Sequence, residues 1–270
     1  VYERLGCNVI ELHGEPDGSF PNHHPDPSKL ENMEDLIKSV KENKCSVGLA
    51  FDGDADRLGV ISPIGEMIFP DRQMIMFSRQ VIQSSPNAKI VFDVKCSKLL
   101  SDEIEKLNGK PLICKTGHTF IKQKIRETNA LLGGEMSGHI FFNDRWPGFD
   151  DGIYAGARML EIIANSEQDD PFVTVPNMLS TPEINIPAAD EEKFQIVKTF
   201  IENSNFSDAK IVSIDGIRVE FEKGWGLLRP SNTSPCLVLR FEAETNDDLK
   251  KIKEIFYLGL KSIKPNINKF

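Results

Sequence analysis

The sequence lacks several features that mark special classes of protein. Its 270 residues contain no apolar run of membrane-spanning length, so we expect no segment that crosses a bilayer. Basic residues are not in excess: 32 Lys and Arg stand against 41 Asp and Glu, and the net charge of −9 argues against nucleic acid as a partner. An anionic ligand would need a local basic pocket, because the overall charge repels it.

The five cysteines are scattered and include no C-x-x-C pair, so the usual spacing of a zinc site is missing. An odd, unclustered set is typical of reduced thiols, and we expect a cytoplasmic protein. The chain starts at Val1 and shows no basic leader followed by an apolar stretch. We therefore expect that the N-terminus of the natural protein is absent.

The first part of the chain predicts a helix over residues 30–44 and strands over 46–51 and 58–63. From residue 89 to residue 165, strand-like and helix-like runs alternate, which indicates an α/β unit with a largely parallel sheet. The last helix of this unit has Asp150 or Asp151 as its cap.

Residues 169–187 contain several prolines and predict a linker of extended character. The order of elements then changes, because one helix precedes three strand-like runs and a last helix begins near Asn246. This α+β pattern predicts a separate C-terminal domain.

Three aspartates, Asp52, Asp54 and Asp56, lie at every second position on the turn between the first two predicted strands. On an extended turn such side chains can converge on one point, and oxygen ligands alone select a hard cation such as Mg²⁺ or Ca²⁺. An EF-hand is excluded, because Arg57 replaces the glycine of its sixth position and Pro63 the glutamate of its twelfth. The alternative is a solvated acidic turn.

Polar residues also gather where two later strands end. Lys95 follows one strand, and Gly117 and His118 open a helix, where backbone N–H groups attract anions. An ordinary surface lysine and a helix cap are the alternatives for these residues.

Residues 131–142 break an apolar run with glycines and polar residues before the chain becomes apolar again. Glu135 and Ser137 alternate and are suited to the hydroxyls of a sugar, and His139 can move a proton at physiological pH. A hairpin turn with polar residues is the alternative.

Residues 229–235 read RPSNTSP and lie between two apolar runs. Arg229 offers a planar fork that matches a phosphate, and Ser231, Asn232 and Thr233 add short polar groups. The alternative is a turn that joins two strands.

Four motifs, FDGDADR, KTGH, GGEMSGH and RPSNTSP, occur in this order along nearly the whole chain. Together they resemble the α-D-phosphohexomutase superfamily, in its bacterial phosphomannomutase/phosphoglucomutase branch, and FPNHHPDP at residues 20–27 is similar to that branch too. The resemblance implies mixed α/β domains followed by a smaller α+β C-terminal domain. It divides the chain into the C-terminal part of domain 2 (1–66), domain 3 (67–178) and domain 4 (179–270).

The resemblance also implies a role for each motif. Asp52, Asp54 and Asp56 would hold Mg²⁺, Arg57 would lie beside the transferring phosphoryl group, and His139 would be the general acid/base. The implied reaction moves phosphate between C1 and C6 of mannose or glucose phosphates, through a phosphoserine enzyme and a bisphosphorylated sugar. The implied substrate-binding residues are Lys95, Gly117, His118, Glu135, Ser137, Arg229, Ser231, Asn232 and Thr233.

The sequence departs from the family pattern in two places. Ala55 stands where the family often has glycine, and we expect an ordinary backbone there, because alanine with a positive φ is strained. The family's phosphoserine lies in a T-A-S-H-N-P-like segment, and no serine here is followed by His-Asn.

We therefore expect the isolated chain to be inactive as a mutase without the N-terminal domain of the same protein. A non-catalytic sugar-phosphate-binding protein is one alternative. A Mg²⁺-dependent phosphatase that uses the aspartate loop alone is another.

Overall fold

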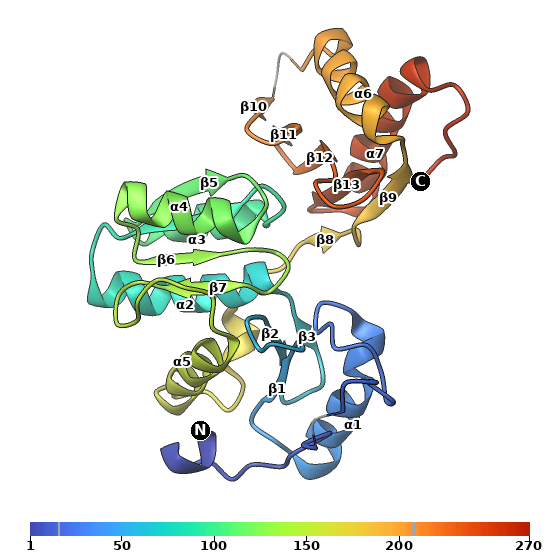
Figure 1. Cartoon of the computed structure of the whole chain (residues 1–270). Coiled ribbons are helices and arrows are strands. Elements are labelled where there is room, and N and C mark those ends of the chain that lie inside the picture. Colours follow the sequence, from blue (N-terminus) through green and yellow to red (C-terminus); the bar gives the residue numbers. More distant parts are fainter. Residues whose placement is uncertain (16, 207–208) are drawn as a thin grey trace. The chain divides into compact units, whose positions relative to one another are not determined.

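Figure 1 shows a computed structural model of the chain, which describes residues 1–15, 17–206 and 209–270. The chain forms two compact units. Unit 1 comprises residues 1–92, 100–112 and 117–176, and unit 2 comprises residues 93–99, 113–116 and 177–270.

The first sheet of unit 1 carries the aspartate loop. Its strands pair antiparallel in the order β1-β2-β3, and Phe51 at the end of β1 lies opposite Leu58 at the start of β2. Helix α1 packs on the sheet through the apolar face that the sequence predicts, because Met33 and Val40 share a core cluster with Ile61. The elements are η1 (Tyr2–Leu5), η2 (Leu30–Met33), α1 (Glu34–Asn43), β1 (Gly48–Phe51), β2 (Leu58–Ile61) and β3 (Met67–Ile68).

The second sheet has the strand order β5-β4-β6-β7; β4 and β6 are parallel, whereas β6 and β7 form an antiparallel hairpin. A Cβ at Gly133 would meet Ile125 of α4, and a Cβ at Gly134 would meet Met74 of α2. Glycines in β6 therefore let helices approach both of its faces closely. The elements are α2 (Pro70–Ser84), β4 (Lys89–Asp93), α3 (Lys98–Lys106), β5 (Lys110–Cys114), α4 (His118–Thr128), β6 (Leu132–Gly134), β7 (Ile140–Phe142), α5 (Gly152–Ala164) and η3 (Pro171–Thr174).

Of the two possible caps of α5, Asp151 is the one that the helix uses. Its side chain accepts a hydrogen bond from the Tyr154 N–H at 2.9 Å. The carboxylate of Asp150 is therefore left for other contacts.

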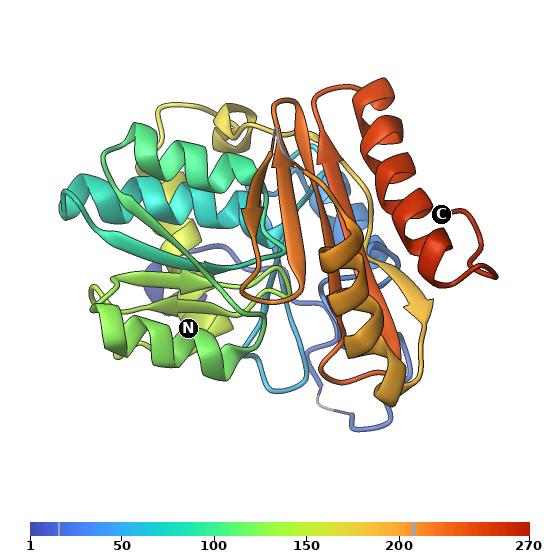
Figure 2. The ribbon, with the colours of Figure 1, turned by 90° about the horizontal axis from the view of Figure 1, so that it is seen from above.

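Unit 2 contains an antiparallel sheet in the order β10-β11-β12-β13-β8, and β9 also pairs with β13. Figure 2 shows α6 and α7 beside these strands, and Phe200 of α6 and Phe256 of α7 share a core cluster with Phe241. The elements are β8 (Leu179–Ser180), β9 (Ile184–Pro187), α6 (Asp190–Asn203), β10 (Lys210–Val212), β11 (Ile217–Phe221), β12 (Gly224–Pro230), β13 (Cys236–Ala243) and α7 (Asn246–Ile263).

The α+β pattern is confirmed, but one expectation for this part of the chain is wrong. The extended linker contains the short strands β8 and β9, whereas β12 is a strand that the sequence analysis did not count. The glycines of β12 weaken its strand pattern in the sequence. They are required by packing, because a Cβ at Gly226 would lie 2.5 Å from the Phe256 ring. Close packing of α7, and not β-propensity, sets the residue at this position.

Within the described ranges, no helix combines the length and the apolar character that crossing a membrane requires. All five cysteines lie in these ranges and are free thiols.

Candidate functional site

The aspartate loop connects β1 to β2 and brings its three carboxylates together. Each aspartate contributes one carboxylate oxygen, and the three oxygens of Asp52, Asp54 and Asp56 lie within 4.8 Å of one another. The three side chains differ in exposure, because Asp52 is buried, Asp56 is half-buried and Asp54 is exposed. The convergence predicted from the alternating positions is therefore present in the structure.

The charge of this loop is compensated unevenly. Asp52 accepts hydrogen bonds from the backbone N–H of Arg57 (3.1 Å) and from its Nε (2.6 Å). Burial alone would raise the pKa of Asp52, but the bonds from Arg57 outweigh it and lower this pKa. Burial, and then the nearby charge of Asp52, raise the pKa of Asp56 to about 6.

The loop fits a hard divalent cation. Its donors are all carboxylate oxygens, and the buried Oδ1 of Asp56 makes no hydrogen bond with the described residues. A buried oxygen without a donor is costly, and a bound cation would relieve that cost together with the repulsion between the carboxylates.

Ala55 does not have the ordinary backbone that we expect from the sequence, because its φ is +60°. Its N–H donates to the carbonyl of Asp52 (3.2 Å), and its carbonyl accepts from the N–H of Gly152 (2.9 Å). These bonds hold the residue in the left-handed region, which costs a non-glycine residue about 1–2 kcal/mol. The turn therefore needs a positive φ, and alanine adopts it under strain.

Neighbouring backbone holds the aspartate loop on two sides. At Gly152, where α5 begins, a Cβ would lie 2.6 Å from the carbonyl oxygen of Arg57 and 2.8 Å from that of Ala55. On the other side, the Leu58 N–H donates to the carbonyl of Gly138 (3.1 Å), and Arg57 pairs with His139 in an antiparallel bridge. The loop is thus fixed to α5 and to the turn between β6 and β7.

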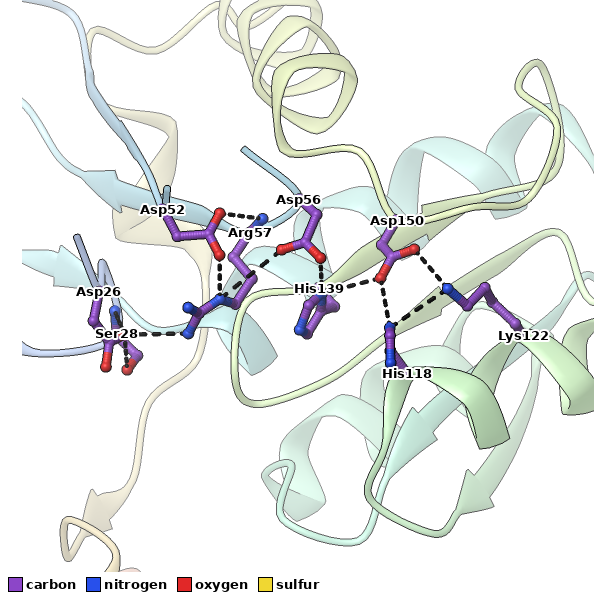
Figure 3. A network of polar contacts seen from close by, with 9 residues as sticks. All are labelled: Asp26, Ser28, Asp52, Asp56, Arg57, His118, Lys122, His139 and Asp150. Atoms are coloured by element: carbon purple, nitrogen blue, oxygen red, sulfur yellow. Dashed lines mark hydrogen bonds and ion pairs between the residues drawn. The ribbon is translucent and has the colours of Figure 1, made fainter. Parts of the chain in front are cut away.

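Arg57 and the two predicted histidines lie in one polar network around this loop (Figure 3). The Arg57 Nη1 lies 3.3 Å from an oxygen of Asp26, and the Nδ1 of His139 lies 3.4 Å from the Oδ2 of Asp56. Burial lowers the pKa of His139, and the carboxylate of Asp150 only partly offsets this effect. His139 is therefore a neutral imidazole near pH 7.

Asp150 belongs to the same network, although the sequence analysis considered it only as a helix cap. Its Oδ2 lies 3.1 Å from the Nδ1 of His139 and 3.2 Å from the Nδ1 of His118, and its Oδ1 lies 3.0 Å from the Nζ of Lys122. Burial alone would raise the pKa of Asp150, but the bond from Lys122 helps to lower it. The sequence does contain a signal for this role of Asp150. Two adjacent aspartates precede α5, and because a helix needs only one of them as its cap, the other is available for a different contact.

Glu135 and Ser137 lie on the turn of the β6–β7 hairpin. The buried carboxylate of Glu135 accepts a hydrogen bond from the Gly117 N–H at 2.5 Å. Gly117 has a φ of +134°, in the region that favours glycine. Glu135 therefore holds the backbone at the start of α4, and Ser137 is half-buried on the same turn.

The remaining predicted residues belong to unit 2. Lys95 is buried, and its Nζ lies 2.7 Å from the Oε1 of Glu183. Burial alone would lower the pKa of Lys95, but the charges of Asp93 and Glu183 outweigh it and raise this pKa. The lysine is therefore charged.

Arg229 lies at the end of β12, and its guanidinium is only partly satisfied. Its Nε donates to an oxygen of Asp215 (2.9 Å), whereas its buried Nη2 has no hydrogen-bond partner among the described residues. The Ser231 hydroxyl accepts from the backbone of Ser234 (3.1 Å) and, more weakly, of Thr233 (3.4 Å), which shapes the following turn. A buried cationic donor without an acceptor fits an anionic ligand. Asn232 is exposed on this turn.

Three domain models match consecutive parts of the chain. They describe the phosphoglucomutase/phosphomannomutase alpha/beta/alpha domain II (residues 1–65), alpha/beta/alpha domain III (69–173) and C-terminal domain (183–258). The chain belongs to the phosphoglucomutase/phosphomannomutase family. The family inferred from the four motifs is therefore confirmed, and so is the predicted fold of mixed α/β domains with a C-terminal α+β domain.

Named relatives of the phosphoglucomutase/phosphomannomutase family are close in sequence. The phosphomannomutase/phosphoglucomutase of Pseudomonas syringae pv. tomato is 52% identical over 270 residues, which are 99% of this chain and 58% of the relative. The phosphoglucomutase of Neisseria gonorrhoeae is 48% identical over 265 residues, which are 97% of this chain and 58% of the relative.

A solved structure of a phosphoglucomutase/phosphomannomutase family protein from Burkholderia thailandensis is also similar, with a TM-score of 0.94 and 45% identity. The match covers 100% of this chain and 58% of that one. The chain thus spans less than two thirds of the length of these family members.

Proposed function

We propose that this chain supplies the metal-, sugar- and phosphate-binding parts of a phosphomannomutase/phosphoglucomutase. Such an isomerase moves a phosphate between C1 and C6 of a mannose or glucose phosphate, through a phosphoserine enzyme and a bisphosphorylated sugar. The observation that carries the proposal is the convergence of Asp52, Asp54 and Asp56 within 4.8 Å, with a buried Asp56 oxygen that accepts no hydrogen bond from the described residues.

Mg²⁺ is the cation that we propose for the aspartate loop, and the oxygen-only donor set supports it. When bound, it would neutralise charge on the phosphoryl group during transfer. Arg57 would bind the same phosphoryl group, and Asp52 and Asp26 fix the direction of its guanidinium. His139 would exchange a proton with the sugar hydroxyl that gains or loses the phosphate.

The substrate contacts are proposed to fall into two sets. The first set comprises Lys95, Gly117 and His118, which would contact the substrate, and Glu135 and Ser137, which would bind sugar hydroxyls. The phosphate that does not react is assigned to Arg229, with Ser231, Asn232 and Thr233 on the turn that follows it. The buried, unpartnered Nη2 of Arg229 supports the second assignment, because an anion would supply its missing acceptor.

We further propose the domain boundaries 1–66, 67–178 and 179–270, which the positions of the three matching models support. An N-terminal domain of the same protein would carry the phosphoserine. We also propose a cytoplasmic location, and the five free thiols support it.

A coupled assay for the conversion of glucose 1-phosphate to glucose 6-phosphate tests this function, with Mg²⁺ and a bisphosphate activator present. The product of the complete gene is expected to turn over, and residues 1–270 alone are expected not to. If residues 1–270 turn over comparably and Ser137→Ala abolishes the activity, Ser137 is the nucleophile and the chain is self-sufficient. Binding without turnover by the complete product would favour the non-catalytic alternative, and release of free phosphate would favour a phosphatase.

A further inference from the structure

Asp150 lies at the centre of a group of cationic and proton-carrying side chains (Figure 3). Only 8% of its side chain is exposed. One of its oxygens, Oδ2, lies 3.1 Å from the Nδ1 of His139 and 3.2 Å from the Nδ1 of His118. The other oxygen contacts the Nζ of Lys122 at 3.0 Å. The Asp150 carboxylate therefore contacts His118, His139 and Lys122 at the same time.

The fold explains why this carboxylate faces the histidines. Asp150 pairs with Phe141 in an antiparallel bridge, and Phe141 follows His139 by two residues in the chain. Asp151 satisfies the N-terminus of α5, so the helix does not need the Asp150 side chain. His118 and Lys122 are four residues apart on α4 and therefore share one helix face.

The surroundings of His139 favour one of its two neutral forms. A neutral imidazole carries a single ring proton, on Nδ1 or on Nε2. Two carboxylate oxygens face Nδ1, one from Asp150 at 3.1 Å and one from Asp56 at 3.4 Å, although neither contact has the geometry of a hydrogen bond. A lone pair on Nδ1 would bring its negative charge close to both anions, whereas an N–H there places a partial positive charge near them.

We propose that Asp150 is a positioning residue, which keeps the ring proton of His139 on Nδ1 and leaves Nε2 to exchange a proton with the substrate. The statement about the proton stands on the geometry, and its catalytic consequence rests on the proposed function. If Asp56 engages a cation, Asp150 is the carboxylate that remains free to face Nδ1. His118 contacts the same oxygen at 3.2 Å and therefore helps to hold it in place.

The ring protons can be observed directly by ¹⁵N NMR of the imidazoles in residues 1–270. The chain has only five histidines, so single substitutions assign the signals. In the unmodified chain we expect His139 to carry its proton on Nδ1. In Asp150→Asn we expect a shift toward the Nε2–H form, and in Asp150→Glu, which keeps the charge, a return toward Nδ1–H.

A matched control is Asp144→Asn. Asp144 is another largely buried carboxylate of unit 1, and its ion pair is with Arg158 at 2.8 Å. This change is expected to leave the His139 signals unmoved. An Nε2–H form in the unmodified chain would overturn the proposal even if Asp150→Asn does not fold. Identical His139 signals in the unmodified chain and in a folded Asp150→Asn variant would overturn it as well.

The catalytic consequence is tested in the product of the complete gene. Asp150→Asn is expected to lower kcat by about 10- to 100-fold and to change KM little, because proton transfer and not binding is affected. Asp150→Glu is expected to recover part of kcat. If the NMR signals shift and kcat does not fall, the general acid/base role of His139 in the proposed function is wrong, whereas the positioning of its proton stands.

Discussion

At the scale of single residues, the aspartate loop combines backbone strain with a charge that is only partly compensated. Ala55 has a φ of +60°, and the buried Oδ1 of Asp56 has no hydrogen-bond donor among the described residues. Neither feature stabilises the fold, and both are expected where a loop is shaped for a ligand. Two predictions belong to this scale.

The strain at Ala55 predicts that Ala55→Gly stabilises the chain. Glycine adopts the positive φ without the steric cost, and this gain exceeds the entropy that glycine adds to the unfolded state. We expect the free energy of unfolding in urea to rise by about 0.5–1 kcal/mol. Ala50→Gly, in the middle of β1, is the matched control and should lower it by about 0.5–1 kcal/mol. Equal losses in both variants would show that Ala55 is not strained.

Replacement of Asp54 by Asn tests the metal site. The change removes one anionic oxygen ligand, while Asp54 is exposed and contributes little to packing. We expect Mg²⁺ affinity, measured by calorimetric titration, to fall by about tenfold or more. Asp17→Asn, at an exposed aspartate bonded to Ser19, should leave the titration unchanged. An unaltered titration in Asp54→Asn would count against the site.

At the scale of secondary-structure elements, the start of α5 shapes the aspartate loop. The N–H of Gly152 donates to the carbonyl of Ala55, and the two backbones approach too closely for a side chain at residue 152. The loop conformation therefore depends on a helix that lies about a hundred residues further along the chain. One prediction follows from this contact.

Gly152→Ala is expected to push the aspartate loop away from α5. The new methyl group would meet backbone atoms, which cannot rotate aside, so we expect a loss of about 1–3 kcal/mol in the free energy of unfolding and weaker Mg²⁺ binding. Gly53→Ala is the control within the same loop, because the nearest atoms to its Cβ are 3.8 Å away. Loss of stability with unchanged Mg²⁺ binding would show that α5 does not shape the metal site.

Elements with one regular pattern could be predicted from the sequence, whereas features set by distant contacts could not. The apolar spacing of residues 30–44 gave a helix because one face packs on the first sheet. β12 escaped prediction because α7 requires glycine in it, and the φ of Ala55 is set by Gly152. The convergence of the aspartates followed from their spacing, but the contact of Asp150 with two histidines arises from its backbone bridge with Phe141, which no regular pattern in the sequence marks.

At the scale of the whole molecule, the charge balance sets the main requirement for an anionic substrate. The chain has a net charge of −9, so a sugar phosphate needs local cations to bind. Arg57 supplies one in unit 1, and the charged Lys95 and the partly satisfied Arg229 supply two in unit 2. The central claim is that Arg229 binds the phosphate of a hexose phosphate.

The most direct test is a calorimetric titration of residues 1–270, with and without Arg229→Ala, using glucose 1-phosphate and free glucose as ligands. We expect Arg229→Ala to weaken the binding of glucose 1-phosphate by about 2 kcal/mol, because a charged hydrogen bond to the phosphate is lost. Binding of free glucose and the Mg²⁺ titration should be unaffected, which also shows that the variant is folded. An unchanged affinity for glucose 1-phosphate, or an equal loss for both sugars, would contradict the account.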